Sequence, residues 1–374
     1  MDNLETAYIN AKKGKKRYQE VIEVEKDKEY YLKKLQFMLL TGNYKTSEYD
    51  VFTKHDGKKE REIYKLPFFP DRIVQWALLE KMEPQLINTF TRDTYSAIPH
   101  RGIHAALKKL RNDIDNHADE MTYCLKIDCK KFYPSIDHEA LKNMFEKKYK
   151  DPKLLAVIFE IIDSISTCPA TDENIKFYSQ FSPVEIVTWH NKEFIKGIGI
   201  PIGNYFSQYD GNFYLSSLDH YCKEILRCKY YYRYMDDVCV FSDSKENLRN
   251  ILKTISDYTT NNLHLRIKEN YQIFPSFVRG IDFVGYRCFR DYTLLRKSTC
   301  IGMKKCLTRI LQKIQSGEEI NYSDYCSISS YEGWLKYCNA YRLRKKYVTP
   351  LEPYRQAYYE KYILPAKKRK GGTG

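Results

Sequence analysis

The sequence contains no run of eighteen apolar residues, which excludes a helix long enough to span a membrane. Residues 1–20 carry charges but no apolar stretch of the kind that a secretory signal needs, so we expect a cytoplasmic protein with no membrane partner. Apolar residues make up 43% and charged residues 29% of the 374 residues, which is the balance of a globular chain of two or three domains or subdomains.

The sequence also contains no C-x-x-C pair. Its eleven cysteines are scattered and odd in number, a pattern that supports neither a disulfide framework nor a structural zinc site. Cys124, Cys129 and Cys239 lie in strand-like apolar stretches, where a free thiol behaves as a small hydrophobic group.

Acidic residues are too few to balance the basic ones. Lysine and arginine number 62 against 48 aspartates and glutamates, which gives a net charge of +14. Aromatic residues make up 15% of the chain, and this combination suits a surface that holds phosphates and stacks bases. The composition therefore favours a nucleic-acid partner, although a generic basic protein would have a similar charge.

Hydrophobic periodicity predicts a mixture of helices and strands. Residues 1–45 look helical, and Asp56-Gly57 is a strong turn signal between two strands within 51–66. Further helices are predicted at 71–90, 103–114, from 136, at 204–226, at 244–262 and from 300 onward, and strands at 122–128, 228–235, 238–242 and parts of 263–289. The polar, poorly patterned residues 166–180 are expected to form a surface excursion.

Two adjacent acids stand between strongly β-prone runs in YRYMDDVCVF. Asp236 and Asp237 would repel each other at the tip of a hairpin unless a cation neutralises them, and Asp128 ends another predicted strand. If these strands are neighbours, three carboxylates converge on one point and can hold hard divalent ions. An exposed Asp-Asp turn is the alternative interpretation of the dipeptide alone.

At this point the sequence resembles a known family. YMDD at 234–237 resembles the signature of reverse transcriptases, and other segments follow that family's order. They are KKEREIYKLPFFPDRIVQWAL, YSAIPHRGIHAAL, LKIDCKKFYPSID, GIPIGNYFSQ, GIDFVGY and SYEGWLKYCNAYRLRKK. The resemblance spans about residues 40–350.

The resemblance implies an α+β right-hand polymerase fold with fingers, a palm built on an antiparallel sheet, and a helical thumb. Residues 1–45 would form an N-terminal helical extension, 46–121 the fingers, 122–290 the palm with an insert at about 151–200, and 291–374 a basic thumb and tail.

The resemblance also implies the metal site. Asp128, Asp236 and Asp237 would hold two Mg²⁺ ions, for which Mn²⁺ can substitute, and the backbone carbonyl of Cys129 would add a ligand.

A nucleotide pocket is implied by further matches. Arg61, helped by Lys58 or Lys59, would clamp the triphosphate of the incoming dNTP, because a guanidinium fork matches phosphate oxygens. Tyr133 would act as a steric gate against the 2′-hydroxyl. The pocket would be completed by Ile202, Gly203, Ser207 and Gln208. A surface arginine and a core tyrosine are the plain alternatives.

The thumb and primer grip would bind the template–primer through phosphate contacts, which position a duplex without reading its sequence. The residues implied are Gly285, Tyr286, Trp334, Lys336, Arg342, Arg344 and Lys345. On the thumb helix, Trp334, Tyr337 and Tyr341 are expected to pack inward.

The function implied is RNA-directed DNA synthesis that makes cDNA from a dedicated template RNA. Most reverse transcriptases have Gln where this chain has Ile202, and the IG…SQ form resembles the low-fidelity enzymes of diversity-generating retroelements, which suggests a small basic accessory protein as a partner. The alternative role is antiphage defence, with a structured non-coding RNA, protein or RNA priming, and the insert at 165–197 as a specific surface. A non-catalytic RNA-binding scaffold is a third interpretation. No segment resembles an RNase H or HNH nuclease.

Overall fold

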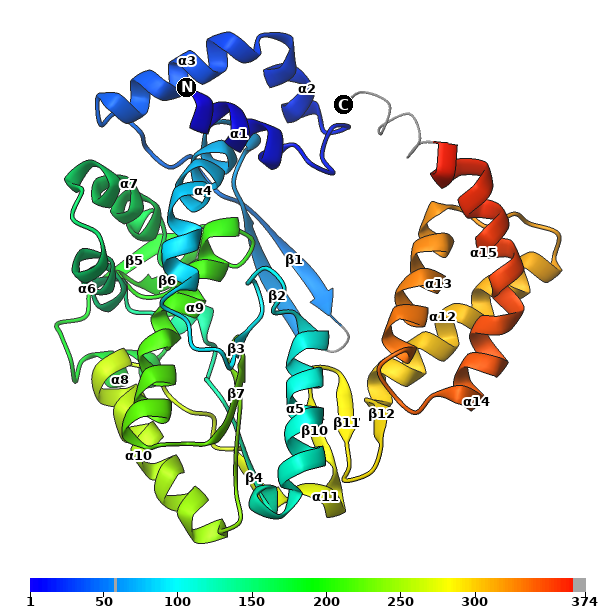
Figure 1. Ribbon diagram of the computed structural model, residues 1–374. Coiled ribbons are helices and arrows are strands. Elements are labelled where there is room, and N and C mark those ends of the chain that lie inside the picture. The colour runs from blue at the N-terminus through cyan, green and yellow to red at the C-terminus, as the bar shows by residue number, and fades with distance from the viewer. Residues whose placement is uncertain (57–58, 366–374) are drawn as a thin grey trace. The chain divides into compact units, whose positions relative to one another are not determined.

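The computed structural model describes residues 1–56 and 59–365, whose contacts group them into two units (Figure 1). The first unit comprises residues 1–100, 125–240 and 246–272, and the second comprises 101–124, 241–245 and 273–374. The chain therefore passes repeatedly from one unit to the other. No described helix is long and apolar enough to cross a membrane.

Helices dominate the start of the first unit, as the sequence predicts. They are α1 (Asp2–Ala11), α2 (Gln19–Lys26), α3 (Lys28–Leu40) and α4 (Ile73–Ile87). Helix α1 packs on α4, where the Asn3 side-chain amide donates to the carbonyl of Ala77 at 3.2 Å (Figure 1). Helix α1 begins with Asp2 and Glu5 in its first turn, where acidic side chains complement the helix dipole.

The predicted hairpin within residues 51–66 is confirmed. Strands β1 (Asp50–Asp56) and β2 (Lys59–Lys65) pair antiparallel with Asp50 opposite Lys65. Alternate side chains of β2 point to opposite faces, so that Tyr64 enters an apolar cluster while Arg61 lies on the other face.

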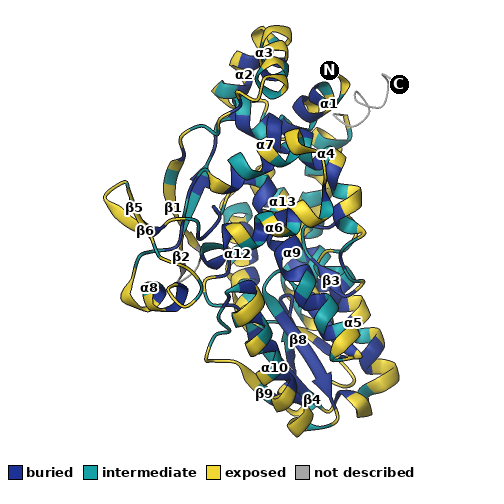
Figure 2. Cartoon of the chain, turned by 90° about the vertical axis from the view of Figure 1, so that its left-hand side faces the viewer, coloured by how far each residue is buried: buried dark blue, intermediate teal, exposed yellow. Residues whose placement is uncertain are grey.

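A five-stranded sheet carries the acidic hairpin, in the order β3-β7-β8-β4-β9. Its strands are β3 (Thr94–Tyr95), β4 (Tyr123–Asp128), β7 (Tyr230–Tyr234), β8 (Asp237–Ser242) and β9 (Gln272–Pro275). Strands β4 and β8 are largely buried (Figure 2). Strand β3 pairs with β7 in parallel, so the sheet is mixed rather than wholly antiparallel as expected.

Helices and a second hairpin complete the first unit. They are α6 (His138–Lys148), α7 (Pro152–Asp163), α8 (Asp172–Tyr178), β5 (Ile186–Trp189), β6 (Lys192–Ile195), α9 (Tyr205–His220) and α10 (Lys245–Leu263). Helix α6 begins where the sequence predicts, because the Asp137 carboxylate caps it by accepting from the Ala140 N–H at 3.0 Å.

The expectation of a surface excursion at 166–180 is wrong. Helix α8 buries Phe177 and Tyr178 in a cluster with Cys168, Ile195 and Ile198. The β5–β6 hairpin also contacts the first hairpin, since the Trp189 ring stacks on Tyr64 with centroids 6.1 Å apart. The insert is thus built into the first unit.

The second unit combines a small sheet with helices. It contains α5 (Ile103–His117), β10 (Ile281–Phe283), β11 (Tyr286–Cys288), β12 (Thr293–Leu295), α11 (Ser276–Arg279), α12 (Lys297–Gln315), α13 (Tyr322–Leu335), α14 (Tyr341–Leu343) and α15 (Glu352–Tyr358). Arg111 on α5 donates to the carbonyl of Phe289 at 2.6 Å. At the β10–β11 turn Gly285 has φ +88°, and the Trp334 ring lies so close that a Cβ there would meet it at 2.6 Å.

Candidate active site

The acidic dipeptide lies at the hairpin tip that the sequence predicts. Strands β7 and β8 are neighbours, and the two residues between them are Met235 and Asp236. Met235 has φ +54°, in the left-handed region that the first residue of a two-residue hairpin turn requires. Glycine usually fills that position, so the turn is held in a conformation that a methionine rarely adopts.

Asp128 lies beside this tip, because β4 is the neighbour of β8 and ends at that residue. The backbone extends the pairing, with the Lys268 N–H donating to the Asp128 carbonyl at 2.9 Å and Cys129 bridging Ile267. Burial and the neighbouring carboxylate of Asp128 together raise the pKa of Asp236 to about 7. Two acids 108 positions apart in the chain therefore meet.

The third acid has a different partner. Asp237 Oδ2 lies 3.1 Å from Lys126 Nζ, an ion pair on the same sheet. Within the described residues, no group of three or more His, Cys, Asp or Glu side chains is arranged to hold a metal ion. The structure thus brings Asp128 and Asp236 together and does not show the three-acid convergence expected from the sequence.

The Asp128–Asp236 pair has the chemistry of a divalent-cation site. Asp128 Oδ1 is buried without a hydrogen-bond partner among the described residues, while Oδ2 contacts Lys268 Nζ. Closely spaced carboxylates repel unless a proton or cation lies between them. Magnesium is commonly bound by one or two carboxylates, with water and substrate phosphates completing the shell. The residues present therefore fit such an ion.

Two adjacent aromatic residues follow Asp128 and have different surroundings. Phe132 is buried, whereas Tyr133 is only partly so and is close enough to Asp236 for that charge to contribute to its raised pKa, after burial. Both rings lie against Gly211 of α9, where a Cβ would meet Phe132 at 3.0 Å and Tyr133 at 3.4 Å. Tyr133 therefore lies within electrostatic reach of Asp236.

The segment before α9 packs on the β1–β2 hairpin, which is the hairpin of the predicted fingers. The carbonyl of Ile202 accepts from the Tyr64 N–H at 2.8 Å, and a Cβ on Gly203 would lie 2.8 Å from the Tyr64 carbonyl oxygen. With φ +126°, residue 203 needs glycine both for its backbone and for this close approach. In the first turn of α9, Ser207 is buried and Gln208 is exposed.

The predicted phosphate clamp is only partly described. Arg61 lies on β2 opposite Lys54, exposed, so two cations face the same side of the hairpin. Lys58 lies outside the described residues, and Lys59 begins β2.

Comparison with known proteins identifies the family. A family model described as reverse transcriptase (RNA-dependent DNA polymerase) matches residues 52–287, which is more than half of the chain. The chain belongs to the reverse transcriptase family.

Relatives of this reverse transcriptase are distant. Protein YkfC of Escherichia coli K12 is 21% identical over 312 residues, 75% of this chain and 80% of that protein. The putative COX1/OXI3 intron 2 protein of Saccharomyces cerevisiae is 20% identical over 274 residues, 58% of this chain but only 29% of that protein.

A solved structure shows the fold. Apo telomerase from Candida tropicalis matches with a TM-score of 0.50 and 12% identity, over 76% of this chain and 51% of the telomerase chain. This reverse transcriptase therefore has the right-hand polymerase fold and spans about half the length of that telomerase. Its class is RNA-directed DNA polymerase.

Of the aromatic residues predicted for the primer grip and thumb, some are buried in the second unit and others lie at its surface. Tyr286 of the reverse transcriptase is fully buried and donates its hydroxyl to the Trp334 carbonyl at 3.0 Å, so its side chain is not available to nucleic acid. Trp334 packs on Gly285 as described above. Tyr341 is 76% exposed, and the expectation that it packs inward is wrong. Tyr337 is half-exposed, with one face stacked on His104 at 3.9 Å between centroids.

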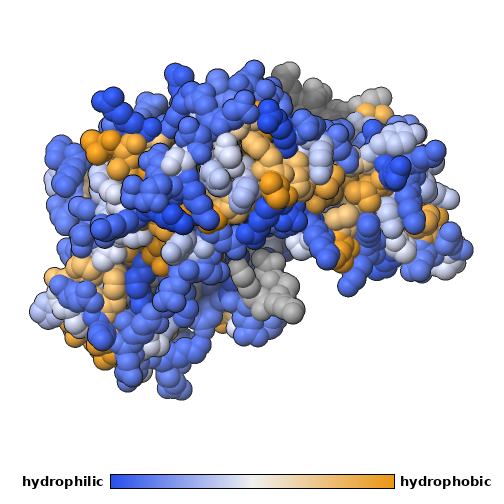
Figure 3. Space-filling view, turned by 90° about the horizontal axis from the view of Figure 1, so that it is seen from below, coloured by the Kyte–Doolittle hydropathy of each residue, from blue (hydrophilic) through white to orange (hydrophobic). Residues whose placement is uncertain are grey.

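The basic residues of the predicted thumb lie at the surface. Lys336, Arg342 and Lys345 are exposed, while Arg344 forms ion pairs with Glu332 and Glu352. The face of the reverse transcriptase in Figure 3 is predominantly hydrophilic, with separate hydrophobic patches.

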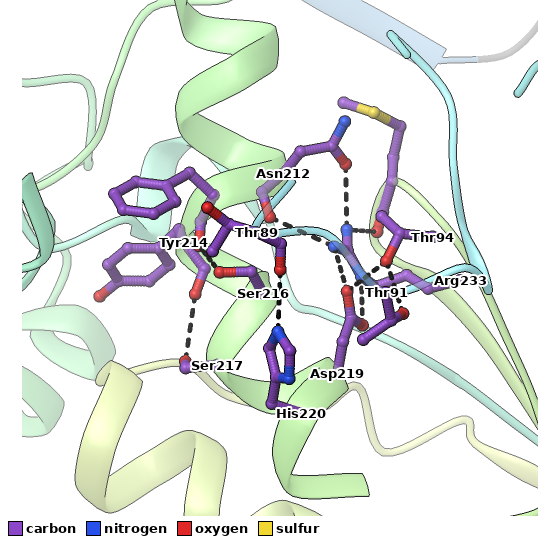
Figure 4. A network of polar contacts seen from close by, with 12 residues as sticks. Thr89, Thr91, Thr94, Asn212, Tyr214, Ser216, Ser217, Asp219, His220 and Arg233 are labelled. Carbon is purple, nitrogen blue, oxygen red and sulfur yellow. Dashed lines mark hydrogen bonds and ion pairs between the residues drawn. The ribbon is translucent and has the colours of Figure 1, made fainter. Parts of the chain in front are cut away.

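Sequence reasoning missed a buried polar network behind the acidic hairpin (Figure 4). Arg233 and Asp219 are both fully buried, with Arg233 Nη2 2.6 Å from Asp219 Oδ2. It also missed Gln75 of α4, whose side-chain oxygen accepts from the N–H groups of Tyr205 and Phe206 at the start of α9. An arginine inside an otherwise apolar strand was the available signal for the network.

Proposed function

We propose that this reverse transcriptase extends a primer by attack of its 3′-hydroxyl on the α-phosphate of a dNTP, at a site formed by Asp128, Asp236 and Asp237. The observation that carries the proposal is the placement of Asp128 and Asp236 together by the neighbouring strands β4 and β8, since closely spaced carboxylates repel unless a proton or cation lies between them. Asp237 follows Asp236 in the chain and starts β8, and its ion pair with Lys126 would have to be replaced by a metal contact.

Two divalent ions are the cofactor of this proposal, Mg²⁺ or its substitute Mn²⁺. Asp128, Asp236, Asp237 and the Cys129 carbonyl would hold them, and when bound they activate the attacking hydroxyl and stabilise the leaving pyrophosphate. The chain's own part is to hold the oxygens in place on a rigid sheet. Strands β4 and β8 do this, because β8 is buried along most of its length and β4 has no exposed residue.

The incoming dNTP would lie between the acid pair and the fingers hairpin. Tyr133 stands beside Asp236 and would exclude a 2′-hydroxyl. Arg61, the exposed Gln208 and the buried Ser207 belong to this proposed pocket, and so does Gly203, whose close approach to the Tyr64 carbonyl joins it to β2.

Replacing each acid by asparagine, which has the same shape but no charge, tests its role. Asp128→Asn and Asp236→Asn should each reduce incorporation of labelled dNTP on an RNA template by at least roughly a thousandfold, because an amide is a poor ligand for Mg²⁺. The thermal unfolding of the variants should stay within a few degrees of wild type. Asp257→Asn, an exposed acid on α10, is the matched control and should keep full activity. Full activity in either test variant would dismiss the proposal.

We further propose that synthesis is error-prone and serves sequence diversification from a dedicated template RNA, with a small basic protein as accessory partner. Support comes from Ile202, whose carbonyl is engaged by β2 and whose side chain offers no hydrogen bond where most family members carry Gln. Selectivity is a difference in transition-state binding, so one missing polar contact loosens discrimination between bases.

Ile202→Gln tests the fidelity proposal. It should lower misincorporation opposite template adenine by roughly tenfold, because a restored hydrogen bond is worth on the order of 1 kcal/mol or more. Sequencing of cDNA made by wild type and variant measures this, with the correct-nucleotide rate as control. Equal error spectra would refute the role of Ile202, and a gene that stands beside a structured RNA without variable repeats would favour the defence role.

A further inference from the structure

Arg233 is the largest fully buried side chain of the described residues and carries a charge (Figure 4). Arginine is almost never fully buried unless it is paired. Here one edge of the guanidinium is paired with Asp219, through Nε to Oδ1 at 2.7 Å and Nη2 to Oδ2 at 2.6 Å. The fork-to-fork geometry fixes the plane of the guanidinium as well as its position.

Asp219 is itself held from two further sides. The hydroxyl of Tyr231 donates to Oδ1 at 2.6 Å, and the hydroxyl of Thr94 donates to Oδ2 at 2.7 Å. These donors come from β7 and β3, while Asp219 lies on α9. The acid is therefore a fixed anchor on which the guanidinium rests.

The free edge of Arg233 points to the acidic hairpin. Its Nη1 donates to the carbonyl of Met235 at 2.9 Å and to the side-chain oxygen of Asn212 at 3.1 Å. Asn212 is in turn fixed, since its amide donates to the Ser96 carbonyl at 2.8 Å. The guanidinium of Arg233, fixed in position and charged, thus donates a hydrogen bond to the backbone carbonyl of Met235, the residue before Asp236.

The bonded carbonyl belongs to the strained residue of the turn. Met235 has φ +54°, a conformation that costs a non-glycine residue free energy and persists only where its surroundings impose it. A buried ion pair is weak evidence for stability, because desolvation offsets much of the attraction. The network is therefore better explained by the turn conformation that it imposes than by the free energy of its charges.

We propose that Arg233 is a positioning residue, which locks the Met235 turn and thereby sets the Asp236 carboxylate beside Asp128 in the geometry that binds divalent ions. This inference rests on the proposed function of the acid pair. It goes beyond that function by assigning metal affinity to a side chain that touches neither the ion nor the substrate.

The test compares Arg233→Lys with Tyr231→Phe. Lysine keeps the charge opposite Asp219, but its single ammonium cannot also hold the Met235 carbonyl. Tyr231→Phe removes one bond to the same Asp219 and leaves the bond from Arg233 to Met235 in place, so it is the matched control. Binding of Mn²⁺ by the full chain with template–primer is measured from the electron paramagnetic resonance signal of free Mn²⁺, with thermal unfolding alongside.

Arg233→Lys should weaken Mn²⁺ binding roughly tenfold, as loss of a group that orients a metal ligand commonly does. It should raise the Mg²⁺ concentration for half-maximal dNTP incorporation by a similar factor. Tyr231→Phe should lower thermal stability but leave both metal measurements at wild-type values. Wild-type Mn²⁺ binding in a folded Arg233→Lys variant would overturn the inference, and so would equal losses in both variants.

A second variant covers the case in which Arg233→Lys does not fold. Arg233→Gln with Asp219→Asn removes both charges together and leaves no lone buried ion. It should fold and show the same roughly tenfold loss of Mn²⁺ affinity, and unchanged affinity would overturn the inference. If wild type binds Mn²⁺ and the variants weaken it, but no dNTP is incorporated, the proposed polymerase function fails while the positioning role stands.

Discussion

Asp210 lies inside α9 with 2% of its surface exposed, and its Oδ1 has no hydrogen-bond partner among the described residues. Burial raises the pKa of this carboxyl well above its ordinary value, so the folded chain holds it neutral where the unfolded chain would ionise it. A single residue thereby makes stability depend on pH. Asp219 is as deeply buried as Asp210, but it forms an ion pair with Arg233, whereas Asp210 has no such cation in the described part of the chain.

Replacing Asp210 with asparagine should flatten this pH dependence. The folded pKa is raised, so the stability that wild type has below pH 4 is lost progressively as pH rises toward the folded pKa, by up to about 1.4 kcal/mol per pH unit. Relative to Asp210→Asn, wild type should therefore become less stable as pH rises above about 4, the ordinary pKa of an aspartate. Urea unfolding of both proteins at three pH values measures the difference. A constant difference across pH would show that Asp210 is ionised in the folded state.

At the scale of single residues, the sequence predicts positions well where a motif contains the residues of a chemical site. It placed Asp128 and Asp236 in contact although they are far apart in the chain. It did not anticipate that Asp237 pairs with Lys126, because alternation along a strand does not say which neighbour a side chain meets. The sequence does not single out Arg233, because the neighbouring YMDD motif is accounted for by its two acids.

At the scale of elements, two glycines of the second unit differ in what surrounds them. Gly285 has φ +88° and lies against the Trp334 ring, which joins the β10–β11 turn to α13. Gly333, next to that tryptophan in the helix, has nothing within 4 Å of where a Cβ would stand. The first glycine is required by its contact, whereas the second only weakens a helix.

Alanine at these two positions should therefore have opposite effects. Gly285→Ala should destabilise the chain by roughly 2–4 kcal/mol, from backbone strain and from overpacking against the ring. Gly333→Ala should stabilise it by about 0.5–1 kcal/mol. Thermal unfolding of the two variants beside wild type measures both. Equal effects would contradict the described contact between Gly285 and Trp334.

Elements with strong periodicity or turn chemistry were predicted, and irregular ones were not. The β1–β2 hairpin, α5, α6 and α9 lie where the pattern put them. The β5–β6 hairpin was missed because its turn uses His190 and Asn191, both with positive φ, in place of an Asn-Gly pair. Strand β12 was missed because three residues give too short a pattern to recognise. The fingers, palm and thumb boundaries stay a prediction.

At the scale of the whole molecule, the net charge of +14 suggests that phosphate contacts dominate affinity for a duplex. The exposed Lys336 and Arg342 are candidates for such contacts, while Arg344 is engaged with Glu332 and Glu352. Cations that bind phosphates release counterions, so their loss should reduce the salt dependence as well as the affinity.

The double variant Lys336→Gln with Arg342→Gln should lower the slope of log affinity against log salt by about 2 for an RNA–DNA duplex, roughly one for each contact. Arg344→Gln is the control and should change the slope less. Fluorescence anisotropy titrations from 50 to 300 mM KCl give the slopes. If the double variant has the wild-type slope, Lys336 and Arg342 do not contact the phosphates of the duplex.

The path of the chain between its two units has a consequence for engineering. Because the second unit takes in residues 101–124 and 241–245 as well as everything from 273, no single crossover in the gene separates it from the first. A chimera that exchanged only the C-terminal part would inherit β10–β12 and α12–α15 without the α5 helix that belongs to the same unit. Grafting this unit onto another polymerase would require three segments to be exchanged together through five junctions, so homologous recombination within the gene is expected to exchange it only rarely.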